Sequence, residues 1–165
     1  MLRQGLLVAG LIVGMPALAS AQTVRSVLQD YGLVGVWAAD CGRAADSGNP
    51  HAKYTLSPSG DGLLFSRTGD ARSDRIYVIY GAERMRDGRL LLHEQRQEDG
   101  AMFDVVLETR QGRLQVWSTQ PHEQDIPIRD PVLVSGKLET PMARCDRRSM
   151  DPEYGAQPQI TPASH

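Results

Sequence analysis

Residues 89–119 read RLLLHEQRQEDGAMFDVVLETRQGRLQVWST, and this stretch decides the fold. Alternating apolar and polar residues are interrupted by two pairs typical of tight turns, Asp99-Gly100 and Gln111-Gly112. Asp-Gly is a leading signal of a two-residue hairpin turn because glycine accepts a positive φ. The stretch therefore predicts three antiparallel strands, over residues 89–97, 102–110 and 113–119.

The register of these strands can be tested within the sequence. Two-residue turns at both pairs place Leu92 and Val116 opposite Leu107, on either side of the middle strand. Both hairpins then select the same face of that strand, and a slip of one residue would reverse every side chain. Trp117 is expected to point outward. The expected inward residues are Leu90, Leu92, Phe103, Val105, Leu107, Leu114 and Val116.

Strand signals continue on both sides of this stretch. Further strands are expected over residues 33–39, 53–56, 62–67 and 75–84, with a last one within 132–144. A short helix over residues 23–31 precedes them, because its apolar residues recur at helical spacing. The Asp87-Gly88 turn fits the inward pattern only if a bulge lies near Gly81. About eight strands in a meander predict an all-β domain closed into a small antiparallel barrel.

The N-terminus reads as an export signal. Arg3 supplies a short positive region, residues 5–18 are nearly all apolar, and Ala19-Ser20-Ala21 has the small-x-small pattern of a cleavage site. The apolar stretch is shorter than the roughly 20 residues of a membrane span. We expect a signal peptide over 1–21, a single barrel domain over 22–148 and a loose tail over 149–165. The mature chain would then be periplasmic or secreted, without membrane insertion.

The only two cysteines, Cys41 and Cys145, are expected to form a disulfide. Lone cysteines of an exported chain usually pair in the oxidising compartment that they reach. They lie near the two ends of the folded region, on the expected first and last strands. Because those strands are neighbours only in a closed sheet, the pairing favours a barrel over an open sandwich.

Composition excludes some classes of partner. The chain has 165 residues, a formal net charge of −2 and a pI of about 6.1. A dedicated nucleic-acid binder would normally carry a basic excess, so no nucleic-acid partner is expected. Hydrophobic residues make up 41%, which suits a globular domain.

A short amphipathic helix followed by Gly35-Val36-Trp37 resembles the start of a lipocalin or related calycin barrel. The string from Gly35 to Asp40-Cys41 is also similar to small exported bacterial proteins, although that likeness implies no activity. The resemblance implies that Trp37 packs structurally across the closed end of the barrel, under an arginine from the last strand. Arg144, Arg147 and Arg148 are the possible partners. The helix that follows a typical lipocalin barrel is missing here.

One end of the expected barrel changes from apolar to polar. Toward the Asp99-Gly100 turn, the predicted register puts Glu94, Val105 and Ser118 in one inward row, and Arg96, Phe103 and Gln120 in the next. A barrel of about eight strands can hold one small ligand at such a mouth. Candidate ligand-binding residues are therefore Glu94, Arg96, Phe103, Ser118 and Gln120. The alternative is that the polar side chains pair with one another at a solvated rim.

No pattern of catalytic or metal-binding residues is recognisable in the sequence. The four histidines, His51, His93, His122 and His165, lack metal-ligand spacing. We therefore expect no cofactor, no metal and no catalytic residues. The leading hypothesis is a non-enzymatic barrel that binds a small apolar or amphipathic ligand. The alternative is a protein-binding module, such as an inhibitor of an envelope hydrolase, that acts through loops 40–52 and 119–131 and has a filled interior.

Overall fold

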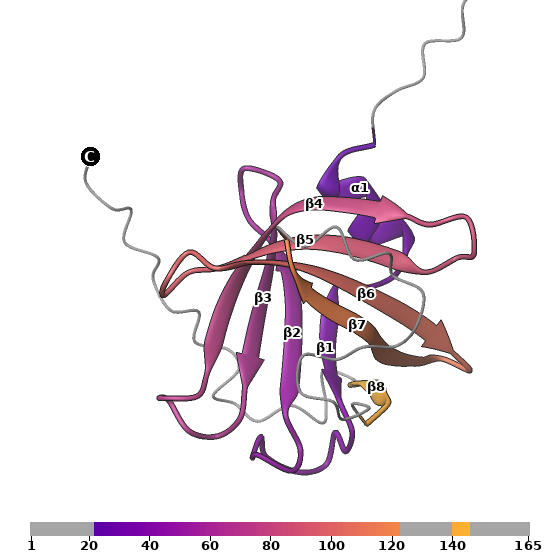
Figure 1. Cartoon of the computed structure of the whole chain (residues 1–165). Helices are drawn as coiled ribbons and strands as arrows, with labels where there is room; N and C mark the ends of the chain where they lie inside the picture. The colour runs from indigo at the N-terminus through magenta and orange to yellow at the C-terminus, as the bar shows by residue number, and fades with distance from the viewer. Residues whose placement is uncertain (1–21, 123–139, 146–165) are drawn as a thin grey trace, which may run out of the picture.

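The computed structural model describes residues 22–122 and 140–145, which form an all-β barrel with one short helix (Figure 1). The helix is α1 (Val24–Asp30). The strands are β1 (Gly35–Ala38), β2 (His51–Leu56), β3 (Gly62–Arg67), β4 (Arg75–Arg84), β5 (Leu90–Arg96), β6 (Met102–Arg110), β7 (Arg113–Pro121) and β8 (Met142–Cys145). Each strand pairs antiparallel with the next, and β8 pairs with β1, so the sheet is closed. The predicted fold class is confirmed, and this architecture is compatible with a lipocalin-like fold.

Helix α1 covers one end of the barrel. The Thr23 side chain caps its first turn by accepting a hydrogen bond from the Ser26 backbone N–H at 3.2 Å. Val27 and Leu28 are buried in the main core, and Leu28 lies directly over Gly62 of β3. A Cβ on Gly62 would come within 2.6 Å of the Leu28 side chain, so the helix can pack this closely only over a glycine. The predicted helix therefore works as an apolar lid.

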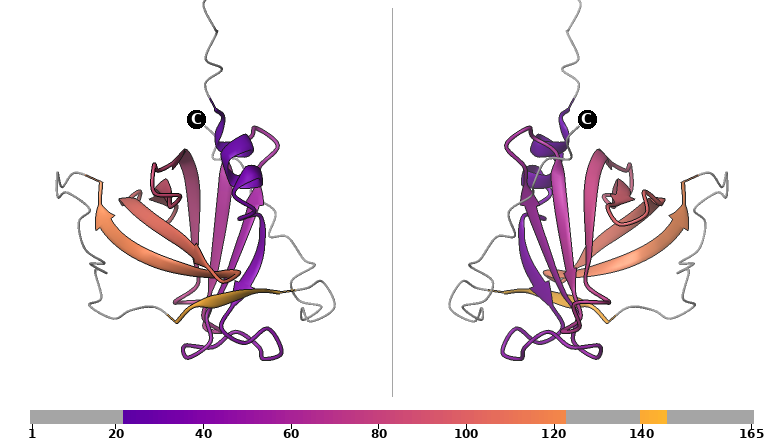
Figure 2. Two further views of the ribbon diagram at one scale, coloured as in Figure 1. Left: turned by 90° about the vertical axis from the view of Figure 1, so that its right-hand side faces the viewer. Right: turned by 90° about the vertical axis from the view of Figure 1, so that its left-hand side faces the viewer.

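The closing strand β8 is short and makes few pairs. It aligns two residues with β7 and three with β1, where Arg144 lies opposite Trp37. The expected disulfide Cys41–Cys145 is present and joins β8 to the loop that follows β1. The two views of Figure 2 show β8 crossing below the long strands to close the sheet. The covalent bond therefore reinforces a strand that has only five aligned residue pairs with its neighbours among the described residues.

Strands β5 and β6 match the predicted faces but not the predicted pairing with each other. Residues 97–100 form the loop between β5 and β6, because the Arg96 N–H bonds to the Ala101 carbonyl. The loop has two residues more than a minimal hairpin, which moves the register by two. Leu92 therefore lies opposite Val105, and Glu94 opposite Phe103. A shift of two preserves the inward face, so the predicted core residues remain in the core or against it.

Two bulges change the direction in which side chains point, one on β4 and one on β7. The expected bulge near Gly81 is present, since the β4–β5 pairing shifts between Ile79 and Gly81. A second bulge, which the sequence analysis did not predict, leaves Trp117 as an extra residue on β7. Beyond it Ser118 pairs with Val106 and Gln120 with Asp104, both outward residues of β6. The prediction that Ser118 and Gln120 share the inward face with Glu94 is therefore wrong, because one extra residue reverses the strand.

Trp37 is buried, and the loop that follows α1 holds it in place. Its indole N–H donates to the Leu33 carbonyl at 2.8 Å. Arg144, one of the three expected partners, extends over Gly35 and donates to the Val34 carbonyl at 2.7 Å. Arg147 and Arg148 lie outside the described residues. The arginine thus ties the last strand to the connection between helix and barrel.

Candidate functional site

A cavity of about 270 Å³ lies inside the barrel at the end opposite α1. Its lining comes from one end of the barrel. At this end β2, β4, β6 and β8 begin, and β3, β5 and β7 end. Its walls are mainly apolar and aromatic, with a few polar groups. The lining residues are Pro50, His51, Ala52, Tyr54, Leu64, Ser66, Tyr77, Glu94, Arg96, Phe103, Val105, Val116, Thr119 and Met142.

Three of the five predicted site residues line this cavity, namely Glu94, Arg96 and Phe103. Ser118 is 2% exposed on the outer face, and its hydroxyl has no hydrogen-bond partner among residues 22–122 and 140–145. Gln120 also faces outward, opposite Asp104. In their place, Thr119 of β7 faces the cavity.

Glu94 is the most unusual group in the cavity. Its side chain is 3% exposed, and no hydrogen-bond partner for its Oε1 occurs in the described part of the chain. Burial raises the pKa of this carboxyl from 4.5 to about 8, since a charge is costly to hold away from water. Glu94 is therefore mostly a neutral acid at pH 7, able both to donate and to accept a hydrogen bond.

Arg96 stands next to Glu94 on the same face of β5, nearer the strand end. Its guanidinium forms a two-bond ion pair with Asp99, at 2.9 and 2.6 Å, and lies 5.3 Å from the centre of the Phe103 ring. Hydrogen bonds from Arg96 hold the pKa of the Asp99 carboxyl at about 2. Because Asp99 already engages the guanidinium, Arg96 forms a fixed part of the rim. Within residues 22–122 and 140–145, burial is the cause of the Glu94 pKa shift, and no cation offsets it.

Aromatic rings and one histidine complete the walls. Tyr77 and Phe103 meet edge to face, with ring centres 6.3 Å apart. Burial lowers the pKa of His51, so this ring is neutral at pH 7. The Asn49 amide N–H group lies 3.2 Å from His51 Nε2. The resulting surface is largely uncharged, which suits an apolar ligand with one polar group.

The loop between β1 and β2 borders the cavity and is held from within. Asn49 is 1% exposed and accepts a hydrogen bond from the Asp40 N–H at 2.9 Å. Its amide donates to the carbonyls of Asp40, Arg43 and Ala44 at 3.0–3.4 Å. One side chain thus satisfies four backbone groups, which fixes the loop. The other predicted contact loop, 119–131, lies outside the described residues beyond position 122.

A second polar cluster lies on the outer face of the same strands. His93, Asp104 and His122 bring three possible metal-ligand atoms within 4.8 Å of one another. The sequence analysis missed this cluster because it sought spacing along one strand, whereas the three residues come from β5, β6 and the end of β7. Alternation could have placed His93 and Asp104 together, but the bulge at Trp117 was needed for His122.

Comparison with protein-family models, curated proteins and solved structures finds no match for this chain. Among the described residues, no helix has the length and apolarity needed to cross a bilayer.

Proposed function

We propose that this chain is an exported, non-enzymatic barrel of the lipocalin-like type, which binds a small amphipathic molecule in the cavity opposite α1. The observation that carries the proposal is Glu94, a buried carboxyl without a partner for Oε1 among the described residues, in a mainly apolar cavity. A buried polar group without a hydrogen bond costs about 1–3 kcal/mol, so its presence needs an explanation. A ligand that completes its hydrogen bonding provides one.

The cavity volume limits the size of the ligand. An apolar cavity of about 150 Å³ is known to hold benzene in another protein, whereas sites for drug-sized molecules start near 300 Å³. The 270 Å³ cavity lies between these values. The proposed ligand is therefore a molecule with one or two rings, or a short branched chain.

The chemistry of the walls limits its polarity. Tyr54, Leu64, Val105 and Val116 offer apolar contact, while Glu94 offers one strong polar position. A ligand hydroxyl, amide or amine would pair with this carboxyl. An anionic head at that position would face a carboxyl, and Arg96 of the cavity lining is already paired with Asp99. We therefore propose an apolar body with a single neutral or basic head group.

The cavity also separates this proposal from the alternative of a hydrolase inhibitor. A barrel acting only through its loops has no need of internal space and was expected to be filled. Phe103, the largest of the predicted inward residues, is only partly buried and leaves the cavity beside it. This observation favours the small-molecule proposal.

Native mass spectrometry of the exported protein, before and after extraction with organic solvent, tests the proposal. The expected result is a bound mass that solvent removes, and the extract then identifies the ligand. Protein that shows only its own mass, and that binds nothing from a panel of one- and two-ring alcohols and amines, would contradict the proposal. A pull-down against envelope proteins would then test the inhibitor alternative.

A pair of variants on β2 localises the binding. Ala52→Leu fills part of the cavity and is expected to remove the bound mass. Thr55→Leu adds a similar apolar group on the opposite face of the strand and is expected to retain it. Binding that survives Ala52→Leu but not Thr55→Leu would place the ligand outside the barrel.

A further inference from the structure

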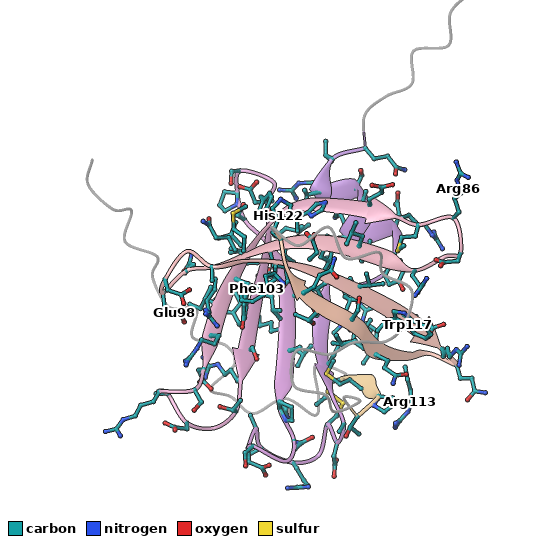
Figure 3. All side chains as sticks on the ribbon, in the orientation of Figure 1. Arg86, Glu98, Phe103, Arg113, Trp117 and His122 are labelled. Carbon is teal, nitrogen blue, oxygen red and sulfur yellow. A yellow bond between two sulfur atoms is a disulfide. The ribbon has the colours of Figure 1, made fainter. Side chains whose placement is uncertain are left out.

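Three polar side chains converge on the outer face of β5, β6 and β7. The ring Nδ1 atoms of His93 and His122 lie 2.6 and 2.8 Å from the same oxygen, Oδ1 of Asp104. The two imidazole rings meet edge to face with centres 5.4 Å apart. Figure 3 labels His122, which follows the end of β7. The cluster is separate from the cavity, since His93 and Glu94 are consecutive residues that point to opposite faces of β5.

The sheet register builds this cluster. His93 lies directly opposite Asp104 in the β5–β6 pairing, and the His122 N–H donates to the Met102 carbonyl, which extends the β6–β7 pairing. The extra residue at Trp117 places Ser118, Gln120 and His122 on the outer face. Without that bulge, His122 would point toward the barrel interior, away from Asp104.

The β4 bulge makes room for the His93 ring. A Cβ on Gly81 would lie 2.5 Å from Cδ2 of His93, so the ring can occupy this position only beside a glycine. Tyr80, the extra residue of the bulge, stacks on His93 with ring centres 6.0 Å apart and meets His122 edge to face. Tyr80 is exposed, so the aromatic wall around the cluster is built at the surface.

We propose that His93, Asp104 and His122 form a binding site for a borderline divalent transition-metal ion, with Zn²⁺ as the test ion. Two imidazole nitrogens and one carboxylate oxygen are the donor set that such ions prefer, whereas Mg²⁺ and Ca²⁺ prefer oxygen ligands. Metal–ligand bonds of about 2.0–2.2 Å require the three donor atoms to surround the ion. They already lie within 4.8 Å of one another, so small side-chain rotations suffice.

Binding needs a change of tautomer rather than a change of fold. In the ion-free arrangement, each ring donates its Nδ1–H to Asp104. Metal ligation instead needs a lone pair on Nδ1, which each ring gains by changing to the tautomer that carries its hydrogen on Nε2. The side-chain exposures of 28% for His93, 15% for Asp104 and 40% for His122 leave the cluster open to an incoming ion. Three protein ligands also leave a coordination position for water or for a ligand from another molecule.

Equilibrium dialysis of the exported protein without an affinity tag, followed by metal analysis, tests the site. We expect one Zn²⁺ per chain, no comparable uptake of Mg²⁺, and a tetrahedral-type absorption spectrum with Co²⁺. His122→Ala should weaken Zn²⁺ affinity by about tenfold or more, since it removes one of three ligands. His122 is exposed enough for this variant to fold, and a thermal melt verifies that it does. His165→Ala is the matched control and should bind as the wild type does.

Two results would overturn the proposal. One is the absence of Zn²⁺ uptake by the folded wild-type protein at about 100 µM free ion, a concentration at which even a weak site with a Kd near 10 µM would be about nine-tenths full. The other is undiminished uptake by His122→Ala. In either case the cluster is a hydrogen-bonded surface triad only. Neither result bears on the cavity, because its ligand is measured separately by mass spectrometry.

Discussion

The two ends of the barrel are built on opposite principles. At the α1 end, Leu28, Ile79 and Leu90 are fully buried, and the helix packs over a glycine with no room for one more carbon. At the other end, the same strands surround a cavity and bury the carboxyl of Glu94. One end of this barrel is therefore filled by apolar side chains, while the other end leaves a cavity and a carboxyl oxygen without a hydrogen-bond partner among the described residues, as the proposed ligand site requires.

Strand β5 contains the whole contrast within seven residues. Leu90 and Leu92 point inward at the closed end, and Glu94 and Arg96 point inward at the cavity end. Because side chains alternate with a period of two, all four share one face of the strand. The change from leucine to ionisable residues along this face therefore marks where the core ends and the cavity begins.

Removal of the disulfide is expected to have the largest effect on the free energy of unfolding, because the disulfide supports both ends of the barrel by closing the sheet. Replacing both cysteines, Cys41→Ser with Cys145→Ser, should lower the free energy of unfolding by about 4–5 kcal/mol in the chain-entropy model for a loop of this size. Urea denaturation measures this loss. Wild-type protein treated with reductant is the control and should match the double variant. A loss below about 1 kcal/mol would mean that backbone pairing alone closes the barrel.

Truncation of a core side chain at the α1 end should have the second largest effect on the free energy of unfolding. Leu28→Ala removes a fully buried side chain from the α1 lid and should cost about 3 kcal/mol, because the surrounding strands cannot collapse into the space. Asp30→Ala, an exposed change on the same helix, should stay within about 0.5 kcal/mol. If the two variants unfold at the same urea concentration, the helix contributes little to the core.

A change that loosens the β1–β2 loop beside the cavity should lower the free energy of unfolding by a smaller amount. Asn49→Ala removes the buried side chain that bonds to backbone groups of Asp40, Arg43 and Ala44, and should cost about 2 kcal/mol. Hydrogen exchange should show faster opening of residues 40–50, with no change in α1. Equal acceleration at both ends would contradict the view that the ends are energetically distinct.

The sequence predicted the parts of the fold that depend on alternation. The inward face of β5 and β6, and of β7 up to Val116, is confirmed by the structure. The bulge near Gly81, the short helix and the disulfide also follow from local patterns and are confirmed. One cavity also brings together Glu94, Arg96 and Phe103, as expected. The unpredicted bulge on β7 does not affect them, because they lie on β5 and β6.

The rest could not be predicted because it depends on backbone irregularities without a strong local signal. The extra residue at Trp117 moved Ser118 and Gln120 to the outer face and brought His122 to Asp104. Nothing in the residues around Trp117 marks a bulge, since no glycine occurs there. The four-residue loop at 97–100 was not predicted because a local signal was misleading. The pair Asp99-Gly100 suggested a two-residue turn, which is tighter than the loop that forms.

The most direct test of the account is the pH dependence of stability for wild type and Glu94→Gln. A carboxyl whose pKa is raised from 4.5 to about 8 by folding binds more protons in the folded state, so its contribution to stability is full below pH 4.5 and is lost as pH rises toward 8. His51, whose pKa is lowered, is present in both proteins, so the difference between their curves isolates Glu94.

We predict that the unfolding free energy of the ligand-free wild type falls, relative to Glu94→Gln, as pH rises from 5 to 8.5. A bound ligand with a basic head group should reduce that fall, because a cation beside the carboxyl stabilises its charged form. Parallel curves for the two proteins over this range would contradict the account. They would show that Glu94 is solvated or paired, and that the cavity end does not hold a buried carboxyl ready for a ligand.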